Sequence, residues 1–114
     1  MIIKNMTNKS KLAEKVICCG KPWSRIRGLL GRPRIHDDEA CWLVPCNAIH
    51  TFGMKYPIDA YFLNKQKGVV AVLKNLKPNR LTPFYLKAYS VLEFTCGPER
   101  SCVVGDKLAV EETP

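Results

Sequence analysis

The stretch "PIDAYFLNKQKGVVAVLKNL", residues 57–76, decides the fold because it predicts a β-hairpin. After Pro57, residues 58–63 are mostly apolar, and alternate side chains of an extended chain point to opposite faces. A five-residue polar loop ending in Gly68 follows, as is typical of a hairpin connection. Residues 69–76 then provide a return strand rich in valine and leucine. Antiparallel pairing of neighbouring segments is therefore the organising principle that we expect.

The rest of the chain predicts more short strands and one helix. Leu92 and Phe94 alternate with Glu93, so we expect the first two to face inward and Glu93 to face outward. Residues 22–31, "PWSRIRGLLG", predict a short helix because Pro22 suits a first turn and apolar residues recur at helical spacing. The further strands are expected at residues 12–19, 41–45, 89–97 and 107–110. Without long helices between strands, the natural architecture is a compact antiparallel β-sandwich or partial barrel with one short N-terminal helix.

Length and composition are those of one globular domain. The chain has 114 residues, of which 46% are hydrophobic. Residues 1–11 are rich in Asn and Lys and predict a flexible N-terminus, whereas residues 12–112 form a single β-rich domain. Residues 1–16 lack the uninterrupted apolar core of a secretory signal, and no apolar run reaches membrane-spanning length. We therefore expect a cytoplasmic monomer with no membrane partner.

The chain contains an unusually large number of cysteines for its length. Disulfide frameworks belong to secreted proteins, and no C-x-x-C pair of the kind used by zinc ribbons or thioredoxins occurs. We expect most of the thiols to be reduced and to pack as small hydrophobes, and we expect no cofactor. The six cysteines are Cys18, Cys19, Cys41, Cys46, Cys96 and Cys102.

The chain is strongly basic, with a formal net charge of +8 and a pI near 9.3. Much of the excess lies in residues 21–34 and 74–87. Such a charge attracts anionic partners in general, nucleic acids and anionic metabolites included, without specifying one. No nucleic-acid-binding motif accompanies it, so binding of nucleic acid and an ordinary solvated basic surface both stay open.

Asp59 is a lone acid within an apolar strand, and a buried charge is costly unless it is paired. Arg25 or Arg32 could bind its carboxylate in a structural ion pair. Alternatively, these arginines, His50 and Asp59 could converge around a small polar or anionic ligand. The leading hypothesis for function is accordingly a non-catalytic binding module with Arg25, Arg32, His50 and Asp59 as its ligand-binding residues.

Two alternatives use other residues of the same region. Cys46, His50 and Met54 are spaced four apart and on a helix would form a soft ligand set for copper, although Pro57 and a Thr-Phe-Gly run oppose a helix there. Cys46 could also serve as the nucleophile of a thiol-dependent hydrolase or transferase, with His50 as base and Asp59 as the orienting acid. The sequence assigns neither a catalytic residue nor a metal site.

Five blocks in fixed order carry a family resemblance: "RIRGLLGR", "PCNAIHTFGMKYPIDAYFLN", "GVVAVLKNLKP", "VLEFTCG" and "VGDKL". Over residues 18–110 the chain resembles the bacterial and archaeal family named domain of unknown function 192. The resemblance implies a small, mostly β domain with jelly-roll-like topology, and it implies no activity, cofactor or substrate. Many members carry a leading hydrophobic segment for export, which is not found in this sequence.

The family motif can be carried over onto this chain residue by residue. It matches at Arg25, Gly28, Leu29, Gly31, Arg32, Cys46, His50, Thr51, Met54, Pro57, Ile58, Asp59, Pro78, Leu92, Glu93, Gly97, Gly105 and Asp106. Among these we take Gly28, Gly31, Cys46, Met54 and Pro57 as structural, because glycines allow a backbone or ligand to approach closely. The other five cysteines fall outside the motif.

Overall fold

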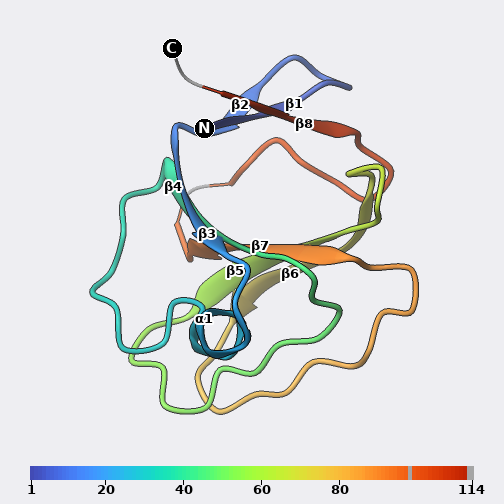
Figure 1. Cartoon of the computed structure of the whole chain (residues 1–114). Helices are drawn as coiled ribbons and strands as arrows, with labels where there is room; N and C mark the ends of the chain where they lie inside the picture. Colours follow the sequence, from blue (N-terminus) through green and yellow to red (C-terminus); the bar gives the residue numbers. More distant parts are fainter. Residues whose placement is uncertain (98, 113–114) are drawn as a thin grey trace.

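The computed structural model describes residues 1–97 and 99–112, apart from the side chains of residues 24–26. Its elements are β1 Ile2–Asn5, β2 Lys11–Ala13, β3 Lys15–Cys19, α1 Pro22–Arg27, β4 Glu39–Leu43, β5 Ile58–Leu63, β6 Val69–Leu76, β7 Ser90–Thr95 and β8 Leu108–Glu111. The strands form two sheets, with the orders β2-β1-β8 and β3-β4-β7-β5-β6, and the described residues form no closed barrel (Figure 1). The prediction of a mainly β fold with two sheets is confirmed.

The predicted hairpin is present as β5 and β6, which pair antiparallel. Asn64 holds its loop, because its side-chain Oδ1 accepts hydrogen bonds from the backbone N–H groups of Gln66 at 3.0 Å and Gly68 at 2.8 Å. β5 also pairs with β7 on its other edge, so that all six of its residues are buried. β5 therefore lies within the hydrophobic core, whereas β6 forms an edge of the larger sheet.

The strand expected at residues 12–19 is two strands, so that prediction was wrong. β2 pairs with β1 in the smaller sheet, whereas β3 pairs with β4 in the larger sheet. The chain crosses between the sheets at Glu14, whose N–H donates to the carbonyl of Asp38 at 2.7 Å. The β3–β4 pair is parallel and departs from the expected antiparallel arrangement.

Residues 2–5, within the segment expected to be flexible, form strand β1. β1 is the middle strand of the smaller sheet, and Ile3 is only 1% exposed. Asn5 is buried too, and its amide nitrogen donates to Asp106 Oδ2 at 2.8 Å and to the carbonyl of Ser101 at 2.9 Å. Because a strand this short buries few side chains, the polar composition of residues 1–11 did not indicate it.

The helical segment is shorter than expected. α1 ends at Arg27, because Gly28 adopts a left-handed backbone conformation with φ 48°. The prediction of a helix through Gly31 was therefore wrong. Trp23, one of the apolar residues at helical spacing, is mostly exposed, with the ammonium of Lys21 5.2 Å from its ring centroid. Leu29, beyond the helix, is the residue that packs into the core.

Figure 1 shows three layers, with the smaller sheet on one side of the larger sheet and α1 with long loops on the other. One hydrophobic core lies between the sheets and includes Ile3, Tyr61 and Phe94. A second lies between the larger sheet and the α1 side and includes Leu29 and Phe62. Both faces of β7 are consequently buried. No helix in the described part is long and apolar enough to cross a membrane.

Candidate functional site

Asp59 is fully buried, as its place in an apolar strand predicted, but its partners differ from those expected. Its Oδ2 lies 2.9 Å from Arg100 Nη1 and 3.2 Å from Lys74 Nζ, and its Oδ1 accepts the N–H of Asn75 at 2.8 Å. Asp59 shares its strand face with Tyr61, which belongs to the core between the sheets. The carboxylate is therefore part of a structural network on that side of the larger sheet.

Arg32 lies on the opposite side, so the predicted Arg32–Asp59 ion pair was wrong. Its Nε donates to the carbonyl of Gly28 at 2.9 Å, and its own carbonyl accepts the hydroxyl of Tyr56 at 3.0 Å. Arg32 lines a cavity of about 240 Å³ together with Lys55. The side chain of Arg25, the other predicted partner, lies outside the described residues. A ligand-binding role of Arg25, Arg32, His50 or Asp59 stays a prediction, but Arg32 and His50 do not form one site with Asp59.

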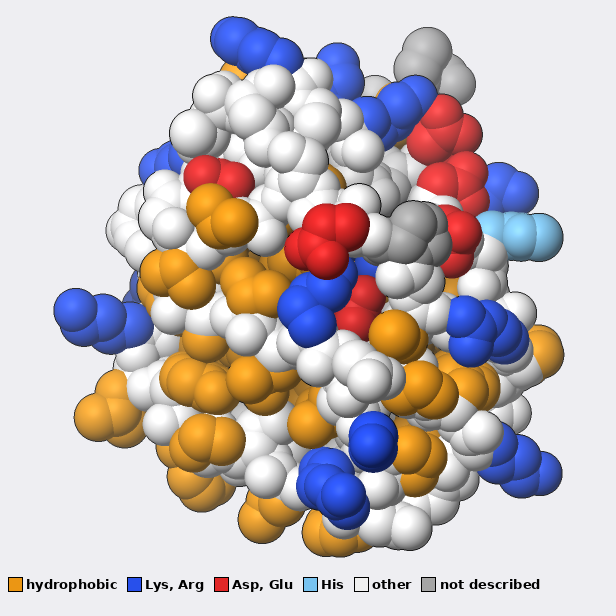
Figure 2. All heavy atoms as spheres, turned by 180° about the vertical axis from the view of Figure 1, so that it is seen from behind, with side chains coloured by type: hydrophobic (Ala, Val, Ile, Leu, Met, Phe, Trp, Pro, Cys, Tyr) orange, Lys and Arg blue, Asp and Glu red, His pale blue; other side chains and the backbone are white. Residues whose placement is uncertain are grey.

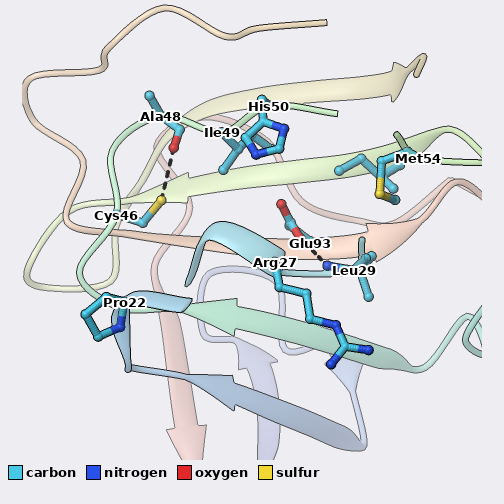
Figure 3. A pocket seen from close by; sticks show the side chains of 10 residues that line it. Pro22, Arg27, Leu29, Cys46, Ala48, Ile49, His50, Met54 and Glu93 are labelled. Carbon is cyan, nitrogen blue, oxygen red and sulfur yellow. Dashed lines mark hydrogen bonds between the residues drawn. The ribbon is translucent and has the colours of Figure 1, made fainter. Parts of the chain in front are cut away.

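His50 instead lines a cavity of about 270 Å³ on the α1 side of the larger sheet (Figure 3). The cavity is enclosed by α1 and the turn after it, by the loop before β5, and by residues of β5 and β7. We call it the β7 pocket. Its lining residues are Pro22, Arg27, Leu29, Cys46, Ala48, Ile49, His50, Met54, Ile58 and Glu93.

Glu93, in the middle of β7, is the acidic group of the β7 pocket. It is 4% exposed, and its Oε1 accepts the backbone N–H of Leu29 at 3.2 Å. Burial raises the pKa of this carboxyl to about 7, and the hydrogen bond from Leu29 opposes the rise in part. Figure 3 shows the carboxylate pointing into the space between His50 and Leu29. The carboxyl thus changes charge near neutral pH inside a largely apolar cavity.

The sequence alternation placed Glu93 on an outward face, and that face is buried beneath α1 and the loops. Gly28 allows the carboxylate to fit there, since a Cβ at residue 28 would collide with Glu93 Oε1. The signals that could have identified Glu93 were a charge within an otherwise apolar strand and its place in the family motif.

His50 is half-buried at the pocket and is held by its neighbours. Its backbone forms a β-bridge with Leu81, and its ring stacks on Phe52 with centroids 5.5 Å apart. Its Nδ1 accepts the N–H of Phe52 at 3.3 Å, which assigns the proton of the neutral ring to Nε2. The ring therefore has a hydrogen-bond donor available on its other nitrogen.

Cys46 and Met54 line the β7 pocket with His50, although not in the helical arrangement that their spacing suggested. Residues 46–56 form an irregular loop with a turn at residues 52–53, and the Cys46 thiol donates to the carbonyl of Ala48 at 3.1 Å. Within the described part of the chain, no three His, Cys, Asp or Glu side chains are grouped to hold a metal ion. Asp59 lies across the sheet and cannot orient His50, so the predicted Cys46–His50–Asp59 triad was wrong.

Comparisons with known proteins identify the fold. The model of a family described as DUF192, "Uncharacterized ACR", matches residues 3–110. A protein of unknown function from Novosphingobium aromaticivorans superposes with a TM-score of 0.78 at 16% identity, covering 96% of this chain and 82% of its own. A "putative transcription regulator" from Sinorhizobium meliloti gives 0.72 at 16% identity, covering 95% and 89%. At this identity the likeness concerns the fold alone. None of the curated proteins matches the chain.

Proposed function

The chain belongs to the DUF192 family, and from the geometry of the β7 pocket we propose that it is a non-catalytic binding module for a small polar ligand that donates a hydrogen bond to Glu93. The observation that carries this proposal is the buried carboxylate aimed into a cavity. A carboxylate has about four acceptor positions, and among the described residues Leu29 N–H is the donor that reaches it. The remaining positions can bind a donor brought by a ligand.

The charges around the cavity favour a hydroxyl or a protonated amine over an anion. Arg27 lines the cavity, but its side chain is exposed and its Nε donates to the carbonyl of Leu30 at 3.0 Å. Figure 3 shows its guanidinium extending away from Glu93. Above neutral pH an anionic ligand would meet an ionised Glu93, and like charges in a buried site repel strongly. We therefore infer a neutral or cationic ligand in place of the anionic one that the basic composition suggested.

The remaining walls define the size and shape of such a ligand. Leu29, Ile49 and Ile58 line the pocket with aliphatic groups and are buried themselves. The volume of about 270 Å³ is at the small end of ligand sites. A short branched alkyl group carrying one hydroxyl or amine satisfies both the walls and the carboxylate.

Titration of the ¹⁵N-labelled protein with isobutylammonium, isobutanol and isobutyrate tests this proposal by NMR. Above neutral pH we expect saturable shifts of the amide signals of Leu29, His50 and Glu93 with the amine, weaker shifts with the alcohol, and none with the carboxylate. Because the pKa of Glu93 is raised to about 7, binding of the amine should weaken below that pH. Preferred binding of isobutyrate, or no saturable shift with any probe, would overturn the proposal.

Two variants make the test specific for the buried carboxyl. Glu93→Gln keeps the oxygen that accepts the Leu29 N–H but removes the charge, so it should lose amine binding and retain part of the alcohol binding. Glu99→Gln removes an exposed glutamate outside the β7 pocket and should bind like the unmodified protein. Equal losses in both variants would indicate nonspecific attraction of the amine.

One observation favours a second function, a thiol-dependent hydrolase or transferase: Cys46 and His50 line the same pocket. A nucleophilic thiol would react with iodoacetamide faster than exposed Cys18, and His50→Gln would slow that reaction. Mass spectrometry of briefly alkylated native protein measures both rates. A Cys46 that reacts no faster than Cys18 would exclude this alternative.

A further inference from the structure

Three bulky apolar side chains of the loop between β6 and β7 are exposed to solvent. Leu81 is 70% exposed, Phe84 is 75% exposed and Leu86 is 93% exposed. We call residues 77–89 the β6–β7 loop. Single exposed apolar residues are common on protein surfaces, but three large ones within six consecutive positions form a candidate interaction surface.

The exposure of these side chains is fixed by the backbone around them. Thr51 N–H donates to the carbonyl of Arg80 at 2.8 Å, and Thr82 N–H donates to the carbonyl of Ile49 at 3.0 Å. The Thr82 hydroxyl accepts the N–H of Ile49 at 2.9 Å. Tyr85 packs inward, its ring centroid 4.5 Å from that of Phe62. The loop is thus tied to the protein by its other residues, which leaves the three apolar side chains directed outward.

The apolar surface continues onto the neighbouring segment. Phe52 is half-exposed and stacks on His50, whose backbone bridges to Leu81 of the β6–β7 loop. Figure 1 places this loop on the α1 side of the molecule, remote from the smaller sheet. Figure 2 shows the molecule from behind. Hydrophobic side chains together with Lys and Arg lie over the lower half of this view, and the acidic side chains lie in its upper half and centre. Apolar and cationic groups therefore share one end of the protein.

The charge of the β6–β7 loop is entirely positive. It carries Lys77, Arg80 and Lys87, and residues 60–92 contain no Asp or Glu. The acids that flank this range, Asp59 and Glu93, are both buried. A surface of exposed apolar side chains among cations, without neighbouring acids, matches the interface of an anionic bilayer: the apolar groups enter the acyl boundary and the cations meet the headgroups.

We propose, against the expectation of no membrane partner, that the β6–β7 loop docks this protein on the surface of bilayers that contain anionic lipid. Aliphatic Leu81 and Leu86 favour lipid over single-stranded nucleic acid, whose bases stack on aromatic platforms. The cations favour lipid over a second copy of the chain, which would bring like charges together across the interface. The protein lies on the membrane by this loop, which adjoins the β7 pocket at His50 but contributes none of its lining residues.

Co-sedimentation with vesicles tests the docking proposal. The protein should sediment with vesicles of phosphatidylserine and phosphatidylcholine, and far less with vesicles of phosphatidylcholine alone. The pair Phe84→Ser and Leu86→Ser should lower partitioning about tenfold or more, because two large apolar groups no longer enter the bilayer. Lys87→Gln should lower it about fivefold, and added salt should do likewise.

The matched control is the pair Val103→Ser and Val104→Ser. Both valines are exposed, and they lie in the loop before β8, so their replacement should leave partitioning unchanged. Circular dichroism melting checks that all variants remain folded. Three results would overturn the proposal: no binding to the anionic vesicles, equal loss in the control pair, or a dimer of the unmodified protein that the Phe84/Leu86 pair converts to a monomer. Binding of single-stranded RNA that is lost with the same pair while vesicle binding persists would also overturn it.

Discussion

At the scale of single residues, the two acids of the larger sheet have opposite surroundings. Asp59 is matched by Arg100 and Lys74, whereas Glu93 is met by one backbone N–H and an open cavity. Burial without a countercharge explains why the pKa of Glu93 is raised to about 7. One acid therefore stabilises the fold, and the other is available to a ligand.

The raised pKa of Glu93 makes stability depend on pH in a definite direction. Its folded value of about 7 lies above the ordinary 4.5, so the folded state retains a proton that the unfolded state releases between these values. The contribution of Glu93 to the free energy of unfolding should thus be greatest below pH 4.5 and fall by up to about 3 kcal/mol as pH rises through 7. Glu93→Gln lacks this fall, so its stability relative to the unmodified protein should rise with pH in urea denaturation. A stability difference that stays constant across this range would contradict the raised pKa.

Asp59 shows which features of the site could be predicted from the sequence. A lone acid in an apolar strand predicted burial and internal pairing, and both are correct. The partner was not predictable, because Arg100 comes from an irregular segment 41 residues away that no periodic pattern connects to β5. Cys46, His50 and Met54 drew attention through a helical spacing, whereas the structure gathers them at the β7 pocket through an irregular loop.

At the scale of elements, local signals predicted local structure. The β5–β6 hairpin was correct because its loop and its two strands are contiguous in sequence. The division of residues 12–19 between two sheets was missed, because it depends on pairing with β1 and β4. The end of α1 depends on the left-handed conformation of Gly28. A glycine permits this conformation but does not require it, so the sequence alone did not predict where the helix ends.

Gly28 and Gly31 offer a matched pair for testing how the turn after α1 positions Glu93. Both have positive φ, 48° and 74°, so alanine at either should cost about 1 kcal/mol of backbone strain. A Cβ at Gly28 also collides with Glu93 Oε1, whereas a Cβ at Gly31 meets no atom within 4 Å. We expect Gly28→Ala to cost about 2–4 kcal/mol and Gly31→Ala about 1 kcal/mol in urea unfolding.

A double-substitution cycle separates the collision from the strain. In a Glu93→Ala background the carboxylate is absent, so the penalty of Gly28→Ala should fall to that of Gly31→Ala. An unchanged penalty would mean that Gly28 is required for its backbone conformation alone and does not make room for Glu93.

At the scale of the whole molecule, the larger sheet is covered on both sides, and this arrangement creates the site. Amphipathic alternation predicts one buried and one solvated face, as in a sandwich of two sheets. Here the second face is covered by α1 and loops, which lack a strong periodic signal of their own. The fold class could therefore be predicted from strand patterns, whereas the buried position of Glu93 and the β7 pocket could not.

The smaller sheet depends on β1, its middle strand. Substitutions in β1 therefore test whether this sheet forms. Ile3 pairs with Ala13 of β2 and Val110 of β8, and it is 1% exposed in the core between the sheets. Ile3→Ala should lower the free energy of unfolding by about 2–5 kcal/mol, since it leaves a cavity between the sheets. Neighbouring Ile2, on the opposite strand face, is half-buried, and Ile2→Ala should cost about 1 kcal/mol. Urea unfolding followed by tryptophan fluorescence measures both, and a flexible N-terminus would instead make both substitutions neutral.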